Sequence, residues 1–397
     1  MCEEDTRAER DAAMAWTRIA EGEDYAAALL TKQMGFALAL DFVRNPALAS
    51  AIPEVIEKGL KRWQPRLSDA TFERDRKAAW EGLGFVYRGG PGYPPRLCDG
   101  AFESLQSIPP LGLWYRGDLG LMEEKCVAIV GSRDATPYGL ALATEMGDAV
   151  ARAGVTVISG GAFGVDAAAH RGVLGAGGRP VVVFACGADR YYPRGNMDMF
   201  RAIERAGGLL VSEAAPGSAP QRHRFLSRNR IISGLAQAVL VVEAPYRSGA
   251  ISTARHALTQ GRPVGVIPNS VRVPQAQGCL RLLREGAVCV RSAEDLLELV
   301  GIDARSGTSH DHDDQLELPV TDPLSGDAST IRVRDALPVR KAVSAERISS
   351  TAGLPLPDVL RALGKLEIFG IAESKGGGLW RLTPPSHVSK RSAAPFA

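Results

Sequence analysis

Basic side chains gather between Ala215 and Leu235, a segment that we expect to be a loop and that contains no acidic residue. Arginine guanidinium groups hold phosphate oxygens in bidentate pairs, and an aromatic ring among them offers a stacking surface to an unpaired base. The pattern favours a site for single-stranded nucleic acid. The alternative is that Phe225 belongs to the core and the cations are merely solvated. The residues concerned are Arg222, His223, Arg224, Phe225, Arg228 and Arg230.

A second candidate site is Gly131-Ser132-Arg133, directly after the apolar run that ends at Val130. Thr136 is a good N-cap, and Pro137 is tolerated at the first position of the helix that we expect there. Small residues, a cation and the free N–H groups of a helix start suit an anion such as phosphate. A plain turn needs the same Gly and Ser, so that alternative stays open.

Two familiar nucleotide-binding motifs are missing. G-x-G-x-x-G does not occur at Gly131, and Ser159-Gly160-Gly161 stands where a dinucleotide-binding protein has a ribose-binding acid. The sequence contains no Walker A motif, which weighs against a nucleotide triphosphatase. Asp166 and His170 lie four residues apart on one helix face. They form either an acid–base pair or, as we favour, a structural Asp at a helix start beside an enclosed His.

A third candidate site follows Glu243. Arg247-Ser248-Gly249, with Ser252 and Thr253 at the start of the next expected helix, resembles a second anion cradle. Glu243 would repel phosphate. We therefore expect its carboxylate to orient loop arginines or backbone amides instead of touching a ligand.

The elements that position these sites are six short runs rich in Val and Ile, separated by segments long enough for helices. Buried strands that alternate with helices predict a parallel sheet covered on both faces. The loops that lead into the runs are short, whereas the loops that leave them carry the candidate residues. In sheets of this kind, ligands bind at the carboxyl ends of the strands. The runs are Val127–Val130, Val155–Ile158, Val181–Ala185, Leu209–Val211, Val239–Val242 and Val264–Ile267.

Flanking segments extend this core. Apolar residues at helical spacing from about Arg7 to Arg62 predict a small helical module, with breaks near Gly22, Asn45-Pro46 and Pro53. Phe85–Tyr87 and Leu113–Tyr115 are candidate short strands at the edge of the main sheet. Near the carboxyl end the pattern predicts two helices, a turn and a two-stranded wing, which together read as a winged helix. Those elements are Ala345–Ala352, Asp358–Phe369, the tip Gly376–Gly378 and Leu379–Leu382.

Composition limits the possible functions. The chain has 397 residues, a hydrophobic content of 45% and a formal net charge of +2, so affinity for a polyanion requires a local patch. Six scattered cysteines, a charged N-terminus and the absence of a bilayer-length apolar run indicate a cytoplasmic protein without membrane association or cofactor. His310–Asp314 offers metal ligands, but we interpret its surroundings as a disordered linker.

The motifs in this order resemble the DprA/Smf family of bacterial DNA-processing proteins, and the similarity runs from roughly Tyr87 to Val300. This sequence departs from the family at four places: Gly161, where Leu is common, Phe163, where Lys or Arg is common, Asn269, where Gly stands, and Gly278-Cys279, where Gly-Thr/Ser-Asn is usual. The matching motifs are Val127–Arg133, Ser159–His170, Tyr192-Pro193 with Asn196, Ser212-Glu213, Ser227–Leu235, Val241–Ala244, Ser248–Ala254 and Gly261–Pro268.

The resemblance implies an extended Rossmann-like core that binds single-stranded DNA as a homodimer and passes the strand to the recombinase RecA in natural transformation. It assigns a phosphate-loop role to Gly131–Arg133 and DNA contacts to Phe225, Arg228, Asn229 and Arg230. The full predicted DNA- or phosphate-binding set is Gly131, Ser132, Arg133, Gly160, Gly161, Arg222, Arg224, Phe225, Arg228, Asn229, Arg230, Ser248, Gly249 and Thr253.

The predicted domains are a helical module of the SAM or helix-hairpin-helix kind (1–75), the core (76–301), a linker (302–330), a winged helix (331–383) and a disordered tail (384–397). Two other functions remain open. A nucleotide or nucleoside-phosphate hydrolase would use Asp166, Glu213 or Glu243 as its base, although no nucleophile stands beside a base at a recognisable spacing. A DNA-anchoring regulator would act through the winged helix.

Overall fold

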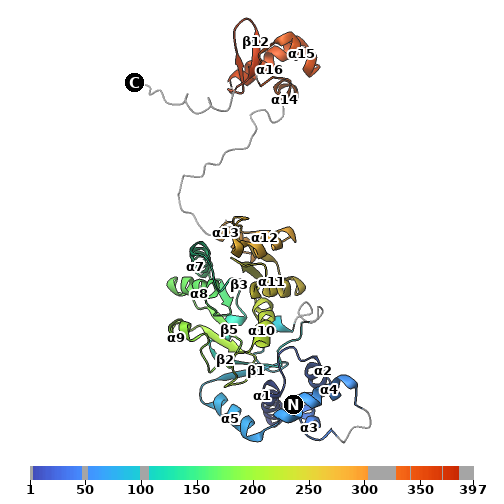
Figure 1. The fold of residues 1–397 in the computed structure, drawn as a ribbon, viewed down its shortest axis with the longest axis vertical. Coiled ribbons are helices and arrows are strands. Elements are labelled where there is room, and N and C mark those ends of the chain that lie inside the picture. The colour runs from blue at the N-terminus through green and yellow to red at the C-terminus, as the bar shows by residue number, and fades with distance from the viewer. Residues whose placement is uncertain are drawn as a thin grey trace. The chain divides into compact units, whose positions relative to one another are not determined.

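The computed structural model describes residues 3–46, 52–98, 107–302, 328–339, 341–368 and 370–383. The chain divides into two compact units, residues 1–308 and 309–397, and each is described by itself (Figure 1). Of the predicted linker 302–330, residues 303–327 with His310–Asp314 lie outside the described residues, as does the predicted tail from 384, whereas residues 328–330 begin helix α14 (Ala328–Asp335).

A nine-stranded sheet forms the centre of the first unit, in the order β1-β2-β6-β5-β4-β3-β7-β8-β9. Strands β3 to β9 pair in parallel, whereas β1 and β2 join antiparallel at one edge. The six predicted runs and the two candidate edge strands are confirmed as β3 to β8 and as β1 and β2. The two-residue β9 was not predicted. The strands are β1 Gly84–Tyr87, β2 Gly112–Gly117, β3 Cys126–Val130, β4 Thr156–Ser159, β5 Val181–Phe184, β6 Leu209–Ser212, β7 Ala238–Val241, β8 Val264–Val266 and β9 Val288–Cys289.

The strand order reverses direction at β3. The chain builds outward through β4, β5 and β6 on one side of β3, and then returns to lay β7 along its other side. In sheets of this type ligands bind where the order reverses, at the carboxyl ends of the two adjacent strands. The loops that follow β3 and β7 therefore meet at the position where a site is expected.

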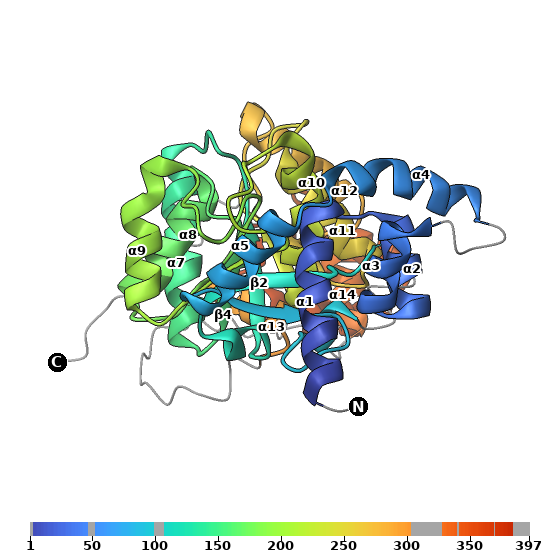
Figure 2. The same cartoon turned by 90° about the horizontal axis from the view of Figure 1, so that it is seen from below.

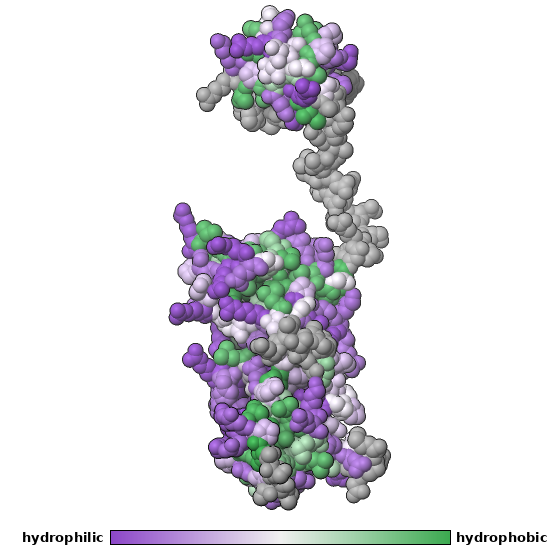
Figure 3. All heavy atoms as spheres, turned by 90° about the vertical axis from the view of Figure 1, so that its right-hand side faces the viewer, coloured by the Kyte–Doolittle hydropathy of each residue, from purple (hydrophilic) through white to green (hydrophobic). Residues whose placement is uncertain are grey.

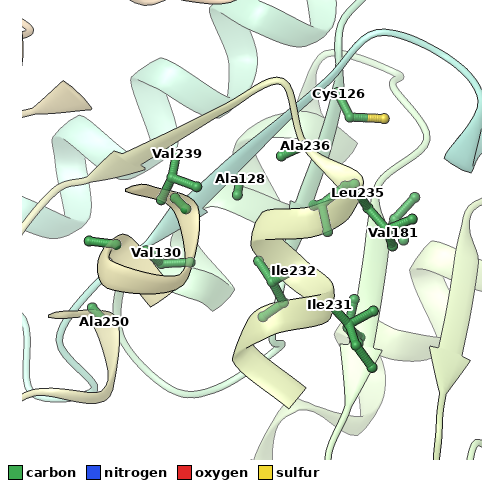
Figure 4. Packing of buried hydrophobic residues seen from close by; sticks show 14 of the residues in the cluster. Cys126, Ala128, Val130, Val181, Ile231, Ile232, Leu235, Ala236, Val239 and Ala250 are labelled. Atoms are coloured by element: carbon green, nitrogen blue, oxygen red, sulfur yellow. The ribbon is translucent and has the colours of Figure 1, made fainter. Parts of the chain in front are cut away.

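Helices cover both faces of the sheet, because side chains alternate between the faces along each strand. Cys126, Ala128 and Val130 of β3 pack in the cluster that holds α10, α11 and α12 (Figure 4), whereas Val127 and Ile129 pack with α7, α8 and α13. Figure 2 shows α7, α8 and α9 together on one side of this unit. The helices are α7 Pro137–Arg152, α8 Val165–Gly175, α9 Met197–Arg205, α10 Arg222–Leu235, α11 Gly249–Thr259, α12 Gln277–Arg284 and α13 Ala293–Leu299.

Within the described residues, five α-helices precede β1. The predicted break at Gly22 separates α1 from α2, whereas the predicted breaks at Asn45-Pro46 and Pro53 both fall between α3 and α4. Two further breaks lie at Gly35, which has φ 80°, and between Trp63 and Asp69. Trp16 and Trp63 pack edge to face with ring centroids 5.1 Å apart. Trp114 of β2 belongs to the same cluster, so the apolar core of these helices continues into the sheet. The helices are α1 Glu3–Ile19, α2 Tyr25–Met34, α3 Phe36–Arg44, α4 Glu54–Trp63 and α5 Asp69–Trp80.

Among the described residues, no single helix has both the length and the apolar composition to cross a membrane. Helices α2 and α3 meet those two criteria only when taken together, and the pair bends by 116° at its break. Figure 3 shows one face of the molecule, on which hydrophilic side chains surround scattered apolar ones.

The second unit has a small core of its own and a three-stranded sheet in the order β10-β12-β11. The predicted helix Ala345–Ala352 is α15, and the predicted tip Gly376–Gly378 has positive φ at all three residues. The elements are α14 Ala328–Asp335, β10 Val343–Ser344, α15 Ala345–Ala352, α16 Leu356–Ile368, β11 Ala372–Ser374 and β12 Leu379–Leu382.

The close approach of α7 and α8 depends on a glycine. A Cβ at Gly172 would lie 2.1 Å from the backbone oxygen of Thr144. Gly172→Ala should therefore lower the free energy of unfolding by about 1–3 kcal/mol, measured by urea denaturation and circular dichroism. Gly175→Ala in the same helix is the control, because nothing lies within 4 Å of its added Cβ. An unchanged stability for Gly172→Ala would contradict the observed packing.

Candidate nucleic-acid interface

A cleft of about 570 Å³ opens at the carboxyl ends of β3 and β7. Four segments line it: the end of β3 with the loop after it, the loop after β4 with the start of α8, α10 as far as Ile232, and the loop after β7 with the start of α11. The cleft therefore lies at the carboxyl ends of the strands, where the loop chemistry predicts a site, and at the point where the strand order reverses. Ten of the fourteen predicted site residues line it: Gly131, Ser132, Arg133, Arg222, Phe225, Arg228, Asn229, Ser248, Gly249 and Thr253.

Three arginines at the cleft are exposed: Arg133, Arg222 and Arg247. Within the part of the chain that the structure describes, none of them forms an ion pair with a carboxylate, and the exposed carboxylate among the lining residues is that of Asp134. The cleft therefore has a net positive surface. Arg247 belonged to the predicted anion cradle but not to the predicted site set.

Phe225 is half-buried beside a cation and a second ring. The Arg133 guanidinium lies 4.9 Å from the centre of the Phe225 ring, close enough for a cation–π contact. The Tyr192 ring lies 5.9 Å away at a tilt, and Tyr192 is 41% exposed. Phe163 is exposed too, but it is not among the residues that line the cleft. Phe225, Arg133 and Tyr192 together form a mixed aromatic and cationic wall.

The prediction that the basic segment Ala215–Leu235 is a loop is wrong from Arg222 onward, because α10 begins at Arg222 and runs to Leu235. Its buried side includes the polar residues Arg228, Asn229 and Arg230. Polar side chains on the buried side obscure the apolar period that identifies a helix in a sequence. Asn229 donates from Nδ2 to the backbone oxygen of Gly249 at 3.2 Å and so joins α10 to the start of α11.

Arg230 does not reach the cleft, which corrects its predicted role as a phosphate ligand. Its side chain is fully buried, and its Nη2 lies 2.7 Å from Oε1 of Glu213. Nε donates to the backbone oxygen of Ile108 at 2.9 Å. The charge of Arg230 is thus neutralised inside the protein, and its guanidinium group ties three segments together.

Arg228 lines the cleft but is only 7% exposed. Its Nη1 donates to the backbone oxygens of Gly160 at 3.0 Å and Val183 at 2.5 Å. Burial lowers its pKa to about 10, so it remains charged at neutral pH. Arg228 was predicted to bind phosphate. Its guanidinium group is instead buried and bonded to the ends of two strands, so only a small part of the side chain faces the cleft.

Gly160 and Gly161 lie outside the cleft lining, which corrects their predicted ligand role. A Cβ at Gly160 would lie 2.2 Å from Nη1 of Arg228. Gly161 has φ 65°, and its Cβ would lie 2.7 Å from the Phe200 ring. Close packing against Arg228 requires a glycine at position 160, and the positive φ and the packing against Phe200 require one at position 161.

Arg224 is also directed away from the cleft. Its Nε and Nη2 donate to the two carboxylate oxygens of Glu21 at 2.9 Å and 3.0 Å, in a bidentate pair. Burial tends to raise the pKa of Glu21, but its bonds to Arg224 and His223 and the charge of Arg66 more than offset this and leave it lowered. The segment Ala215–Leu235 contains no acid of its own, and the carboxylate that pairs with Arg224 comes from Glu21, 203 residues earlier in the chain.

Glu243 is fully buried at the start of α7. Its carboxylate accepts from the backbone N and Oγ1 of Thr136 at 2.8 Å and 2.6 Å, and from Nδ2 of Asn269 at 3.2 Å. Its backbone oxygen accepts from the N–H of Ser132 at 2.6 Å. The expected role in orienting amides is confirmed. The N-cap Thr136 at the start of α7 is therefore not free to hold the phosphate expected there, because the protein's own carboxylate is bound to it.

Asp166 and His170 do not form an acid–base pair. Oδ2 of Asp166 accepts from the backbone N–H groups of Gly160 and Ala162 at 3.2 Å and 3.3 Å, and burial raises its pKa. His170 is fully buried, and neither ring nitrogen has a partner. The structural interpretation is confirmed. Among the described residues, no group of three His, Cys, Asp or Glu side chains is arranged to hold a metal.

Fold and cleft together define a Rossmann-like α/β protein with a cationic cleft where its strand order reverses. The sequence pattern of the family described as DNA recombination-mediator protein A matches residues 85–301. A putative DNA processing protein DprA of Mycobacterium tuberculosis is 35% identical over 390 residues, covering 93% of this chain and 94% of the relative. The chain therefore belongs to the DNA recombination-mediator protein A family, which confirms the resemblance to DprA/Smf proteins.

Two other relatives agree with this assignment. Protein Smf of Escherichia coli K12 is 34% identical over 305 residues, covering 75% of this chain and 77% of the relative. The X-ray structure of DNA processing protein A from Streptococcus pneumoniae aligns with a TM-score of 0.58 and 27% identity. That alignment covers 73% of this chain and 97% of the other.

The unpartnered His170 predicts a specific pH dependence. Burial lowers its pKa to about 3, so between that value and its ordinary pKa of about 6.5 only the unfolded chain binds the proton. As the pH is lowered through this window, the free energy of unfolding should decrease by up to about 1.4 kcal/mol per pH unit. His170→Leu should remove that component in urea denaturation at pH 4 to 7. Parallel pH profiles for the parent and His170→Leu would contradict it.

Proposed function

We propose that this protein binds single-stranded DNA in the cleft between β3 and β7 and acts as a non-catalytic recombination mediator. The observation that carries the proposal is the convergence of Arg133, Arg222 and Arg247, from three separate segments, around the half-buried Phe225. Phosphates of a flexible strand can follow such a group of cations. A base freed from stacking can contact the aromatic wall.

Single strands fit this site better than duplex. A duplex keeps its bases stacked, whereas the Phe225 ring lines the cleft, with the Tyr192 ring 5.9 Å from it, and offers its contacts to a base that has left the stack. The N-cap Ser248 and the exposed Gly249 line the cleft at the start of α11, where a helix offers backbone N–H donors to an anion. Binding should therefore depend on strand form more than on base sequence.

The carboxylates considered for a hydrolase favour binding over catalysis. Asp166 is held by two backbone amides, Glu213 by Arg230, and Glu243 by Thr136 and Asn269. A general base needs an accessible carboxylate that can take a proton from a substrate or water. Each of these carboxylates already serves the fold, so we propose no catalytic residue and no cofactor.

We further infer that two copies act together and that the bound strand is delivered to the recombinase RecA, as the family resemblance implies. Strand β9 supports the dimer, because it forms one edge of the sheet and both of its residues, Val288 and Cys289, are exposed. Exposed strand edges are surfaces where another chain can pair. The second unit would act as a winged helix, in contact with protein or duplex DNA.

The cytoplasm is the compartment that we propose for this activity. The cysteines within the described residues, Cys98, Cys126, Cys186, Cys279 and Cys289, are all free thiols. Free thiols are the usual state in a reducing compartment.

Replacing an exposed cleft arginine should change the salt dependence of binding. Arg222→Ala removes one phosphate contact, so the slope of log affinity against log salt should become shallower by about 0.7. Fluorescence anisotropy of a labelled oligothymidine at several salt concentrations measures the slope. Arg152→Ala, at an exposed ion pair with Asp148 on α7, is the control and should leave affinity and slope unchanged.

The buried arginine gives the contrasting result. Arg230→Ala leaves Glu213 unpaired and should lower the free energy of unfolding by about 3–5 kcal/mol, without changing the salt slope of the fraction that folds. If Arg230→Ala flattened the slope and Arg222→Ala did not, the assignment of the cleft would be wrong.

A further inference from the structure

The first turn of α10 is electrostatically unfavourable as it stands in the sequence. It begins with Arg222, His223 and Arg224, contains no acidic residue, and its N-cap Gln221 makes no side-chain hydrogen bond to the helix. A helix start carries a partial positive charge and favours anions. This turn therefore needs negative charge from elsewhere to hold its conformation.

Glu21, in the turn between α1 and α2, supplies that charge. Its carboxylate pairs in bidentate fashion with Arg224 and lies 3.2 Å from Nε2 of His223. Arg66, after α4, contacts the same carboxylate at 3.2 Å and ties it to the N-terminal helices. Glu21 thus links two parts of the chain that are about 200 residues apart in sequence.

The turn fits closely against the segment that it supports. A Cβ at Gly22 would lie 2.5 Å from Oε2 of Glu213 and 2.9 Å from Oγ of Ser227. Arg18 pairs with Asp75 at 2.7 Å and donates to the backbone oxygen of Pro216, in the loop before α10. The N-terminal helices therefore hold both α10 and the loop that leads into it.

The two sides of α10 have different tasks. Arg222, Phe225 and Asn229 line the DNA cleft. Arg224 and Ser227, with Glu21, line a separate small cavity of about 60 Å³ against the N-terminal helices, and Arg228 borders both spaces. Glu21 is not among the residues that line the cleft, so its effect on a bound strand must pass through α10.

We propose that Glu21 is a positioning residue for strand binding: it fixes the first turn of α10 so that Arg222 and Phe225 face the cleft. The inference rests on the proposed function and adds to it, because it makes the N-terminal helices part of the binding apparatus. It also gives Arg224 a role other than phosphate binding, namely as the partner through which Glu21 acts.

The test is Glu21→Gln in the full chain, which keeps the shape of the side chain and removes its charge. Glu21→Gln should bind a labelled oligothymidine about tenfold more weakly, as expected if the competent arrangement falls to about a tenth of the population. The salt slope should stay the same, because no phosphate contact is lost. Glu57→Gln is the matched control, since Glu57 pairs with Lys61 within α4 and should not affect binding.

A double-mutant cycle with Arg224→Gln decides whether Glu21 acts through Arg224. Arg224→Gln breaks the same pair from the other side, so each single variant and the double variant should show the same loss of affinity. It also keeps the proposal testable if Glu21→Gln does not fold. A shallower salt slope for Arg224→Gln would instead show that Arg224 binds phosphate, and would overturn the proposal.

Other outcomes separate this inference from the proposed function. Unchanged affinity for a folded Glu21→Gln, with the parent binding normally, would reject the inference alone. Tighter binding with a steeper salt slope would also reject it, because Glu21 would then act only by repelling the strand. A parent protein that does not bind single strands would reject the proposed function itself.

Discussion

The structure depends on the neutralisation of positive charge along α10. A helix that starts with three basic residues, and that buries two further arginines in its middle, is unfavourable unless carboxylates and carbonyls surround it. Glu21 and Glu213 supply the carboxylates, and the backbone oxygens of Gly160 and Val183 supply acceptors for Arg228. These acceptors come from the N-terminal turn and from the ends of three strands. The helix therefore forms in its observed position only when those parts are assembled.

The arginines fall into two groups, which differ in how deeply their side chains are buried. Those that meet internal acceptors, such as Arg224, Arg228 and Arg230, join segments of the fold. Those that remain exposed at the cleft, Arg133 and Arg222, keep their charge available to a polyanion. The same residue type in one short segment thus has two functions, and burial decides which. At the start of α7, the buried carboxylate of Glu243 binds the backbone of Thr136, and the cations that line the cleft come from neighbouring loops.

The period of apolar residues predicts the main sheet well, because buried parallel strands are continuous apolar runs with terse loops between them. It also locates the cleft, since the loops that carry the candidate binding residues all leave the carboxyl ends of the strands. The sequence does not show the helix at Arg222, because polar residues such as Arg228, Asn229 and Arg230 interrupt its buried side. Nor does it show which arginines are neutralised, since that depends on a carboxylate as distant as Glu21. Long-range ion pairs have no signal in local spacing.

Amide hydrogen exchange of the whole chain, with and without a single-stranded oligonucleotide, tests most directly whether three segments form one binding surface. The account predicts slower exchange in the presence of the strand at residues 131–134, 222–229 and 245–253, and no change at the loops on the opposite edge of the sheet. Protection confined to the opposite edge, or to residues 328–383 alone, would contradict it.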